Sequence, residues 1–440
     1  MSIEILTLIM LAAMMGLMVI GLPLVFVTGV VSLAFALALY GPMSLTLISS
    51  RVYSFVSVYA LVAVPMFVLM ASILERSGVA KDLFKAMHIF AGGLKGGLAI
   101  QTMAVAVLMA AMTGIIGGEI VLLGLVALPQ MLALKYDRKL AIGTICAGGS
   151  LGTMIPPSIV LIFFGLTASV SIGELFMATI IPGLLLAGLY VLYILIRCHI
   201  NPELGPPAPI EERDLPLREK LILFRDVAMP LSVAVMVLGS IYGGIASVSE
   251  SAGMGVIGVL ISAKIRKELS WEMLRGDLIQ TTMTCAVILW LTFGANALIG
   301  VYNLMGGIDF VRELISGLPF PPMVIIILMM LILVVLGFFI DWIGIMLLTM
   351  PIFVPIIIAM GYSPIWFGIL FCMNMQISYL SPPFGPAAFY LKGVAPPEKR
   401  QPGEKSGQQL RQRYRREKKL EAHQVELLKL QSHLESTGRK

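Results

Sequence analysis

Charged residues are scarce in this sequence. Only 13% of its 440 residues are Asp, Glu, Lys or Arg, whereas a soluble domain carries about 25%. Hydrophobic residues make up 58% of the chain, and the mean hydropathy is +0.95. This composition excludes a soluble domain, because too little polar side chain is available to cover its surface. We therefore expect an all-α, polytopic membrane protein.

Sequence motifs for catalysis are missing as well. The four cysteines lie scattered through apolar segments, with no spacing typical of a metal site or a disulfide framework. There is no phosphate-binding nucleotide loop and no nucleophile–base pair, so we expect neither an enzyme nor a cofactor. The net charge of +6 lies mostly in loops and in the tail. It fits the excess of positive charge on the cytoplasmic side of membrane proteins better than a nucleic-acid partner.

The most informative stretch is residues 148–158, GGSLGTMIPPS, inside a segment without any charge between residues 140 and 173. Glycines and paired prolines would break a membrane helix there and free backbone groups at a depth where lipid cannot bind them. Such breaks are tolerated where they line a cavity or are buried in protein, and in carriers they hold substrate and coupling ion. A second stretch of this kind, SYLSPPFGP, occupies residues 378–386.

The two breaks belong to a longer repeat. Glu119 lies ten residues before Pro129, Asp341 lies ten residues before Pro351, and a proline doublet follows each pair. Each half therefore has an apolar helix, a polar tip with one acid, a second apolar helix and a broken helix. An internal repeat of this order predicts two helical hairpins. The first has helices at 98–112 and 120–134 with its tip at 113–119, and the second has helices at 323–337 and 343–360 with its tip at 338–341.

Charge predicts how the two hairpins are oriented. Lysines and arginines flank both bases of the first hairpin, but Arg312 is the only such residue between Arg275 and Lys392. The positive-inside rule places the first pair of bases in the cytoplasm and the second pair on the outer face. Because the hairpins would enter from opposite sides, we expect an inverted repeat.

Further spans are expected outside the hairpins. The apolar start is too long for one span, because about 20 residues cross a bilayer, and a Gly-Leu-Pro sequence at 21–23 divides it into two helices. Other spans are expected at about 58–74, 175–196 and 281–302, with two shorter ones before 262. Residues 75–88 are expected to lie in the membrane interface. Glu250 is read as a helix cap or an interfacial acid.

Five segments in order resemble the large membrane subunit (M subunit) of tripartite ATP-independent periplasmic (TRAP) transporters. They are residues 64–80, 136–165, 243–258, 336–356 and 377–398, and the resemblance covers residues 1 to about 397. It implies an elevator-type, sodium-driven carrier in the bacterial inner (cytoplasmic) membrane, where a mobile domain moves substrate across a static scaffold. The implied partners are a small membrane subunit, a periplasmic substrate-binding protein, Na⁺ and an organic acid such as a dicarboxylate.

This resemblance implies a division of the chain. The scaffold would comprise helices and an interfacial arm at 1–97, and further helices at 166–322 with a cytoplasmic linker at 201–220. The transport domain would comprise a first repeat at 98–165 and a second at 323–397, each with one hairpin and one broken helix. Residues 398–440 form a polar tail, expected to be either a short exposed helix or disordered.

Sodium prefers hard oxygen ligands, which helix breaks supply as free carbonyls beside hydroxyls and a carboxylate. The alternative is that the hydroxyls only bond back to the backbone or to a neighbouring helix. Asp341 has the further alternatives of staying protonated or of capping its helix through the amides of Ile343 and Gly344. Glu119 is expected to be structural or proton-linked. The predicted sodium ligands are Ser150, Gly152, Thr153, Asp341, Ser378 and Ser381.

The carboxylate of the substrate is expected to favour amides at helix N-termini, where the helix dipole attracts anions. Glycines at the first tip would let a ligand approach the backbone closely. Their alternative role is close packing between helices, and the hydroxyl of Ser158 could also face the cation. The predicted substrate-binding residues are Thr113, Gly114, Gly117, Gly118, Pro156, Pro157, Ser158, Pro382 and Pro383.

Two features depart from the family pattern. The first tip, TGIIGGE, lacks the small hydroxyl residues of most relatives, and a polar tail stands where relatives continue into a last membrane helix. Two alternative functions therefore stay open beside the sodium-coupled importer. One is an ion antiporter on a related inverted-repeat scaffold, which would need no binding protein. The other is a truncated, non-transporting membrane subunit.

Overall fold

The computed structural model describes residues 2–79, 82–84, 94–114, 117–207, 217–316, 319–382 and 385–395, and all regular structure within these ranges is helical. The prediction for the tail at 398–440 lies outside the described residues, as do residues 80–81 and 85–88 of the expected interfacial arm.

The apolar start forms two helices, as predicted. Helix α1 spans Ile3–Val19 and α2 spans Leu24–Tyr40, and Gly21 between them has a φ of +94°. A further helix, α3 (Ser44–Val56), was not predicted, because Arg51 and several serines interrupt its apolar pattern. Arg51 is exposed, and its Cδ lies against Gly300 of a later helix.

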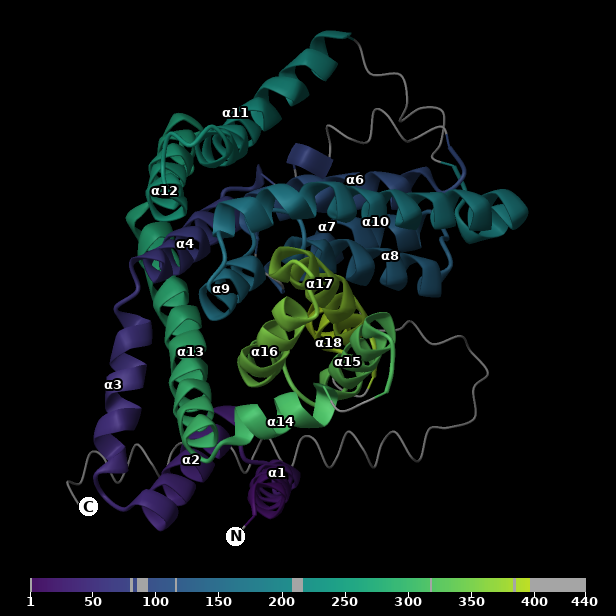
Figure 1. Ribbon diagram of the computed structural model, residues 1–440. Coiled ribbons are helices and arrows are strands. Elements are labelled where there is room, and N and C mark those ends of the chain that lie inside the picture. The colour runs from purple at the N-terminus through teal and green to yellow at the C-terminus, as the bar shows by residue number, and fades with distance from the viewer. Residues whose placement is uncertain are drawn as a thin grey trace, which may run out of the picture. The chain divides into compact units, whose positions relative to one another are not determined.

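The expected scaffold spans are α4 (Ala63–Arg76), α11 (Leu217–Tyr242), α12 (Val248–Ile265) and α13 (Trp271–Leu304). The long helix α13 packs against α2, α3 and α4, and α12 packs against α4 and α11 (Figure 1). Ser247 and Glu250 form a capping box at the start of α12, which confirms the interpretation of Glu250 as a cap.

The first hairpin and its broken helix follow the predicted order. Helices α6 (Gly97–Thr113) and α7 (Gly118–Ala133) form the hairpin. Helix α8 (Arg138–Ser150) then passes into a short 3₁₀ turn at Leu151–Thr153, and α9 (Ile159–Ala168) resumes after the proline doublet. The long helix α10 (Ile172–Ile200) follows, and a 3₁₀ turn at Pro202–Leu204 begins the linker.

The second half has the same order of elements. Helices α15 (Pro322–Gly337) and α16 (Trp342–Ala359) form the hairpin, and α17 (Pro364–Leu380) and α18 (Pro386–Val394) form the broken helix. Helix α14 (Gly307–Ser316), which precedes this hairpin, was not predicted. Both helix breaks are therefore confirmed, while the inverted relation of the halves stays a prediction.

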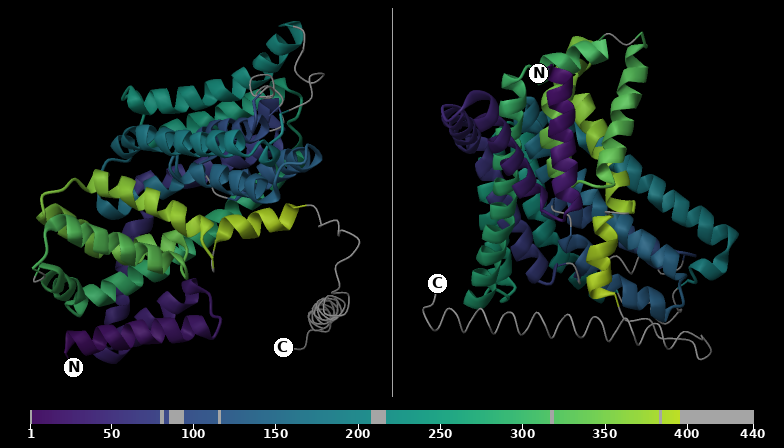
Figure 2. Two further views of the ribbon diagram at one scale, coloured as in Figure 1. Left: turned by 90° about the vertical axis from the view of Figure 1, so that its right-hand side faces the viewer. Right: turned by 90° about the horizontal axis from the view of Figure 1, so that it is seen from below.

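In each half, the helix after the break packs against the hairpin of the other half, an arrangement that we call the helix exchange. Helix α9 of the first half packs against α16 of the second hairpin, and α18 of the second half packs against α7 of the first hairpin (Figures 1 and 2). Helix α17 also contacts α8 and α9. This packing places α17, which leads into the second break, against the two helices that flank the first break.

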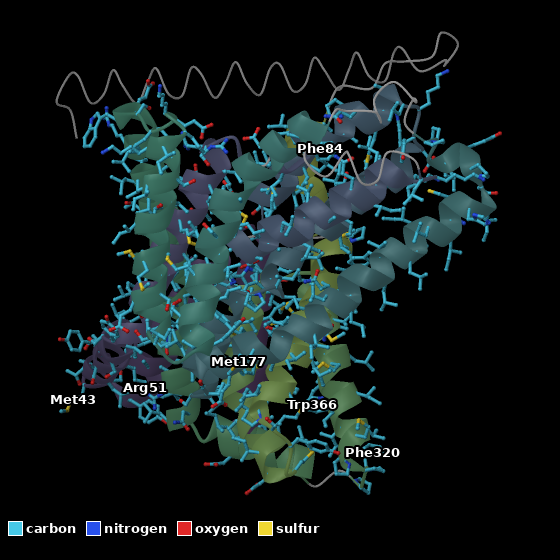
Figure 3. All side chains as sticks on the ribbon, turned by 90° about the horizontal axis from the view of Figure 1, so that it is seen from above. Met43, Arg51, Phe84, Met177, Phe320 and Trp366 are labelled. Carbon is cyan, nitrogen blue, oxygen red and sulfur yellow. The ribbon has the colours of Figure 1, made fainter. Side chains whose placement is uncertain are left out.

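Five helical segments in the described ranges are long and apolar enough to cross a membrane. Large apolar side chains on their outer surfaces are consistent with lipid contact, for example Met177 and Ile181 of α10 (Figure 3). The segments are Tyr59–Arg76, Ile172–Ile200, Val248–Ile265, Trp271–Leu304 and Trp342–Ala359.

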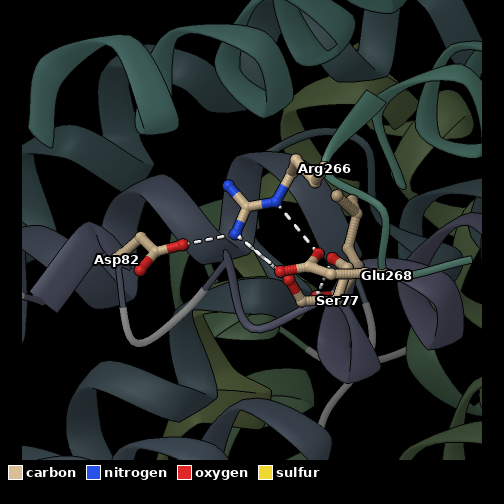
Figure 4. Close-up of polar contacts among 5 residues, drawn as sticks. Ser77, Asp82, Arg266 and Glu268 are labelled. Atoms are coloured by element: carbon tan, nitrogen blue, oxygen red, sulfur yellow. Dashed lines mark hydrogen bonds and ion pairs between the residues drawn. The ribbon is translucent and has the colours of Figure 1, made fainter. Parts of the chain in front are cut away.

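An ion-pair network holds one end of the expected scaffold together. The guanidinium of Arg266, just after α12, contacts the carboxylates of Asp82 and Glu268 and the backbone carbonyl of Ser77 (Figure 4). The distance from Arg266 Nε to Glu268 Oε2 is 2.9 Å. The hydrogen bonds that Arg266 donates to the carboxylates of Glu268, which has the larger effect, and Asp82 raise the pKa of Arg266.

Candidate functional site

The first hairpin tip lies directly on the first break. Gly114 ends α6 with a φ of +62°, and a Cβ added to it would lie 2.0 Å from the carbonyl oxygen of Pro157. The amide of Ile159 donates to the carbonyl of Gly114 over 3.3 Å. Only glycine fits this position, because both the backbone angle and the close approach exclude a side chain. The fold thus brings Gly114, Pro157 and Ser158 together, and their contact with substrate stays a prediction.

The hydroxyls of the first break are fully buried and donate to nearby backbone carbonyls. Ser150 Oγ donates to Ala147 over 2.8 Å, Thr153 Oγ1 to Ser150 over 2.9 Å, and Ser158 Oγ to Thr153 over 2.6 Å. These hydrogen bonds agree with the alternative interpretation, in which the hydroxyls only bond to the backbone of their own segment. A hydroxyl oxygen that donates keeps acceptor lone pairs, so a cation-binding role for Ser150 and Thr153 stays a prediction.

Glu119 joins the tip to the break. Its side chain is completely buried, and one carboxyl oxygen accepts a hydrogen bond from Thr113. The other oxygen has no hydrogen-bond partner in the described part of the chain. A Cβ on Gly152 would lie 2.9 Å from the Glu119 carboxylate. This carboxyl therefore sits beside the backbone that was predicted to bind the cation.

Protein atoms already contact the two glycines at the start of α7. Gly117 lies under the ring of Tyr390 from α18, and a Cβ on Gly118 would lie 1.7 Å from the carboxylate of Glu75 in α4. Side chains of the protein therefore approach this backbone closely, which agrees with the alternative role of the glycines in helix packing. A substrate role for Gly117 and Gly118 stays a prediction. Glu75 lies near the end of the apolar helix α4, and its contact with the first hairpin was not predicted.

At the second tip, Asp341 is the N-cap of α16. Its carboxylate accepts from the amide of Ile343 over 3.4 Å, which matches the capping alternative. Capping leaves most of the carboxylate's acceptor capacity free, so the predicted sodium contact is compatible with the cap and stays a prediction.

The second break is less enclosed than the first. Ser378 Oγ is buried, lies against Gly337, and has no hydrogen-bond partner among the residues that the structure describes. Ser381 is half-buried, and its carbonyl accepts from the amide of Gly385 over 3.0 Å. Pro382 is exposed. Pro383 lies outside the described residues, so the structure does not place this predicted substrate contact.

Sequence reasoning missed Gln376, which links the two halves. This residue of α17 is buried, and its Nε2 donates to the carbonyl of Ser150 over 3.0 Å and to Thr153 Oγ1 over 2.6 Å. A polar side chain inside a membrane-spanning helix is expensive and usually functional. That signal, just before the second break, could have identified it.

The family of tripartite ATP-independent periplasmic transporters, DctM component, has a sequence profile that matches residues 11–418 of this chain. The chain belongs to this family. The match covers both hairpins and both broken helices, and it confirms the resemblance to the TRAP large membrane subunit. All matched elements that the structure describes are helical, in agreement with the expected all-α membrane fold.

Relatives of this TRAP subunit cover most of its length. The C4-dicarboxylate TRAP transporter large permease of Vibrio cholerae is 27% identical, with 86% of this chain and 87% of that protein covered. The ectoine TRAP transporter large permease of Halomonas elongata is 29% identical, with 86% and 88% covered. The isethionate TRAP transporter permease of Oleidesulfovibrio alaskensis is 26% identical over 86% of this chain, which spans only 59% of that longer protein.

A solved structure has a similar fold. The crystal structure of the YdaH transporter from Alcanivorax borkumensis superposes with a TM-score of 0.55 and covers 82% of this chain and 83% of that one. The sequences are only 17% identical, so this similarity concerns the fold alone.

Proposed function

We propose that this TRAP large subunit carries out secondary active import of a small organic acid that a periplasmic binding protein delivers. Sodium is the proposed coupling ion, and a small membrane subunit is the proposed second membrane partner. The relatives are named for C4-dicarboxylates, ectoine and isethionate. Three different substrates within one family support a general transport role without selecting one acid for this chain.

One observation carries this proposal: two broken helices meet inside the protein, each beside a hairpin tip. The first break contacts Gly114 and Glu119, and the second follows Ser378, which lies against Gly337. Broken backbone at this depth provides free amides and carbonyls for a carboxylate and a cation. A bound cation would also offset the cost of bringing an anionic substrate into an apolar region.

The helix exchange supports movement as one body. Because α9 packs on α16 and α18 packs on α7, neither half can shift alone without breaking these contacts. In the proposed mechanism, residues 98–165 and 323–391 move together relative to α4, α12 and α13. The substrate and the ion would travel with them, and each would become accessible from the opposite side at the end of the movement.

The test is reconstitution in proteoliposomes. The chain is purified with its small membrane subunit, and labelled C4-dicarboxylate, ectoine and isethionate are offered with and without the binding protein under an inward sodium gradient. We expect uptake of one acid that needs both the gradient and the binding protein. Uptake that is independent of the binding protein would favour an antiporter, and no uptake by the complete, folded complex would contradict the proposal.

A further inference from the structure

Gln376 makes the side-chain hydrogen bonds that tie the first break to the helix leading into the second. It lies in the last turns of α17, two residues before Ser378, and is only 3% exposed. Its Nε2 reaches across to the other half, where it donates to the Ser150 carbonyl over 3.0 Å and to Thr153 Oγ1 over 2.6 Å.

The two acceptors are themselves bonded to each other. Ser150 is the last residue of α8, so its carbonyl has no partner within that helix. Thr153 Oγ1 donates to the same carbonyl over 2.9 Å while it accepts from Gln376. The three groups form a closed triangle around the turn at Leu151–Thr153, which fixes the backbone where the chain leaves α8.

The oxygen of the Gln376 side-chain amide makes no hydrogen bond to the described residues. Gln376 Oε1 and Ser378 Oγ are both buried without a hydrogen-bond partner in the described ranges. Asn374, on the same helix, provides a comparison. Its Nδ2 donates to the carbonyl of Met330 over 2.8 Å, so its bond stays within the second half. Gln376 differs from Asn374 because its bonds cross between the halves.

We propose that Gln376 is a positioning residue that makes the two breaks respond to ligand as one unit. Any shift of the Ser150 carbonyl or the Thr153 hydroxyl on ligand binding pulls on the amide and so on the end of α17. Ser378 and the second break then move with it. The cooperativity part of this inference rests on the proposed sodium-coupled transport, whereas the mechanical link does not.

Two variants and one matched control test the proposal. Gln376→Met keeps the length of the side chain and removes both hydrogen bonds, and Gln376→Leu removes both with a shorter apolar side chain. Asn374→Leu removes the side-chain hydrogen bond that Asn374 of the same helix makes to Met330, within the second half. If Gln376→Met fails to fold, Gln376→Leu provides the same comparison.

The first measurement is hydrogen–deuterium exchange of the purified complex over residues 148–158. We expect Gln376→Met to raise exchange at the first break by roughly five-fold, since a typical hydrogen bond contributes about that factor to a local equilibrium. Asn374→Leu should leave exchange at the first break at the wild-type rate. Equal exchange in wild type and in both folded Gln376 variants would overturn the proposal.

The second measurement is the sodium dependence of uptake, with N-methylglucamine replacing sodium to hold the ionic strength. We expect the Hill coefficient of the Gln376 variants to fall toward one and the half-saturating sodium concentration to rise about five-fold or more. Asn374→Leu should keep the wild-type steepness. Unchanged steepness in the Gln376 variants overturns the coupling. If wild-type uptake does not depend on sodium, the sodium part of the proposed function fails. The hydrogen–deuterium exchange of residues 148–158 then decides whether Gln376 stabilises the first break.

Discussion

Glu119 has the most unfavourable surroundings of the candidate residues. It is completely buried, and Thr113 is its only hydrogen-bond partner in the described part of the chain. A charged carboxylate in such a place costs several kcal/mol unless a counter-charge is present. A bound proton removes that cost, so we interpret Glu119 as a structural or proton-linked acid rather than a sodium ligand.

Glu119→Gln is expected to leave the sodium dependence of uptake intact. Glutamine has the shape of the protonated acid, and its carbonyl oxygen can still accept from Thr113. The measurement is uptake against sodium concentration at wild-type expression level. Loss of sodium stimulation in a well-expressed variant would contradict this interpretation and make Glu119 a cation ligand.

Asp341 has two proposed roles, and one substitution separates them. Asn caps helices about as well as Asp, so Asp341→Asn should keep the start of α16 and lose the full negative charge. We expect the half-saturating sodium concentration to rise roughly ten-fold or more, since a charged partner contributes about 1.5–3 kcal/mol. Docking of the binding protein should change far less. An unchanged half-saturation would leave Asp341 with the capping role alone.

At the scale of helices, the contact between α4 and α7 depends on Gly118. Its backbone is helical, and the three atoms nearest to the place of a Cβ all belong to the Glu75 carboxylate, the closest at 1.7 Å. Gly118→Ala should therefore lower the free energy of unfolding by about 1–3 kcal/mol, as overpacking does, and should slow uptake. Thermal unfolding of the purified complex measures this.

The double variant Gly118→Ala with Glu75→Ala should recover most of that loss, because the clash disappears. Gly143→Ala is the matched control, since α8 leaves open space around Gly143. Alanine there should be neutral or stabilise by up to about 1 kcal/mol, because glycine weakens helix interiors. An equal loss from Gly143→Ala would show that the effect at Gly118 has no relation to Glu75.

The elements that could be predicted were those set by local chemistry. Prolines cannot continue a helix without loss of a hydrogen bond, so α9 and α18 begin where the doublets indicated. Helices α3 and α14 were missed because they are short and polar on one side. The hydrogen bonds of Gln376 were not predictable either, because they depend on which distant helices meet. The same holds for the contact of Glu75 with Gly118.

At the scale of the whole molecule, the proposed boundary between mobile and static parts can be tested with paired cysteines in a cysteine-free background. A bridge between Gly118→Cys and Glu75→Cys would join α7 to α4, across the boundary. A bridge between Gly124→Cys and Leu391→Cys would join α7 to α18, inside the mobile part, where a Cβ on Gly124 would lie 2.6 Å from the Leu391 side chain. A disulfide needs Cβ atoms about 3.5–4.5 Å apart, so the extent of each bridge is measured before uptake is compared.

We expect oxidation to stop uptake by the first pair and to leave uptake by the second pair near its reduced value. Reduction should restore the first pair, which controls for damage by the substitutions. Gel mobility after labelling of free thiols measures how far each bridge forms. Normal uptake with a complete bridge between α4 and α7 would show that these helices belong to the same rigid part.

The exchange of α9 and α18 also has a consequence for biosynthesis. The apolar helix α9, buried along residues 159–165, packs against α16, which begins at Trp342. At typical synthesis rates, α16 leaves the ribosome roughly ten to thirty seconds after α9. During that interval the first half is already inserted, and lipid must cover the surface that α16 will later occupy. Lipid therefore covers this surface of the nascent chain for a time. Neither half can reach its final packing before the other has been translated.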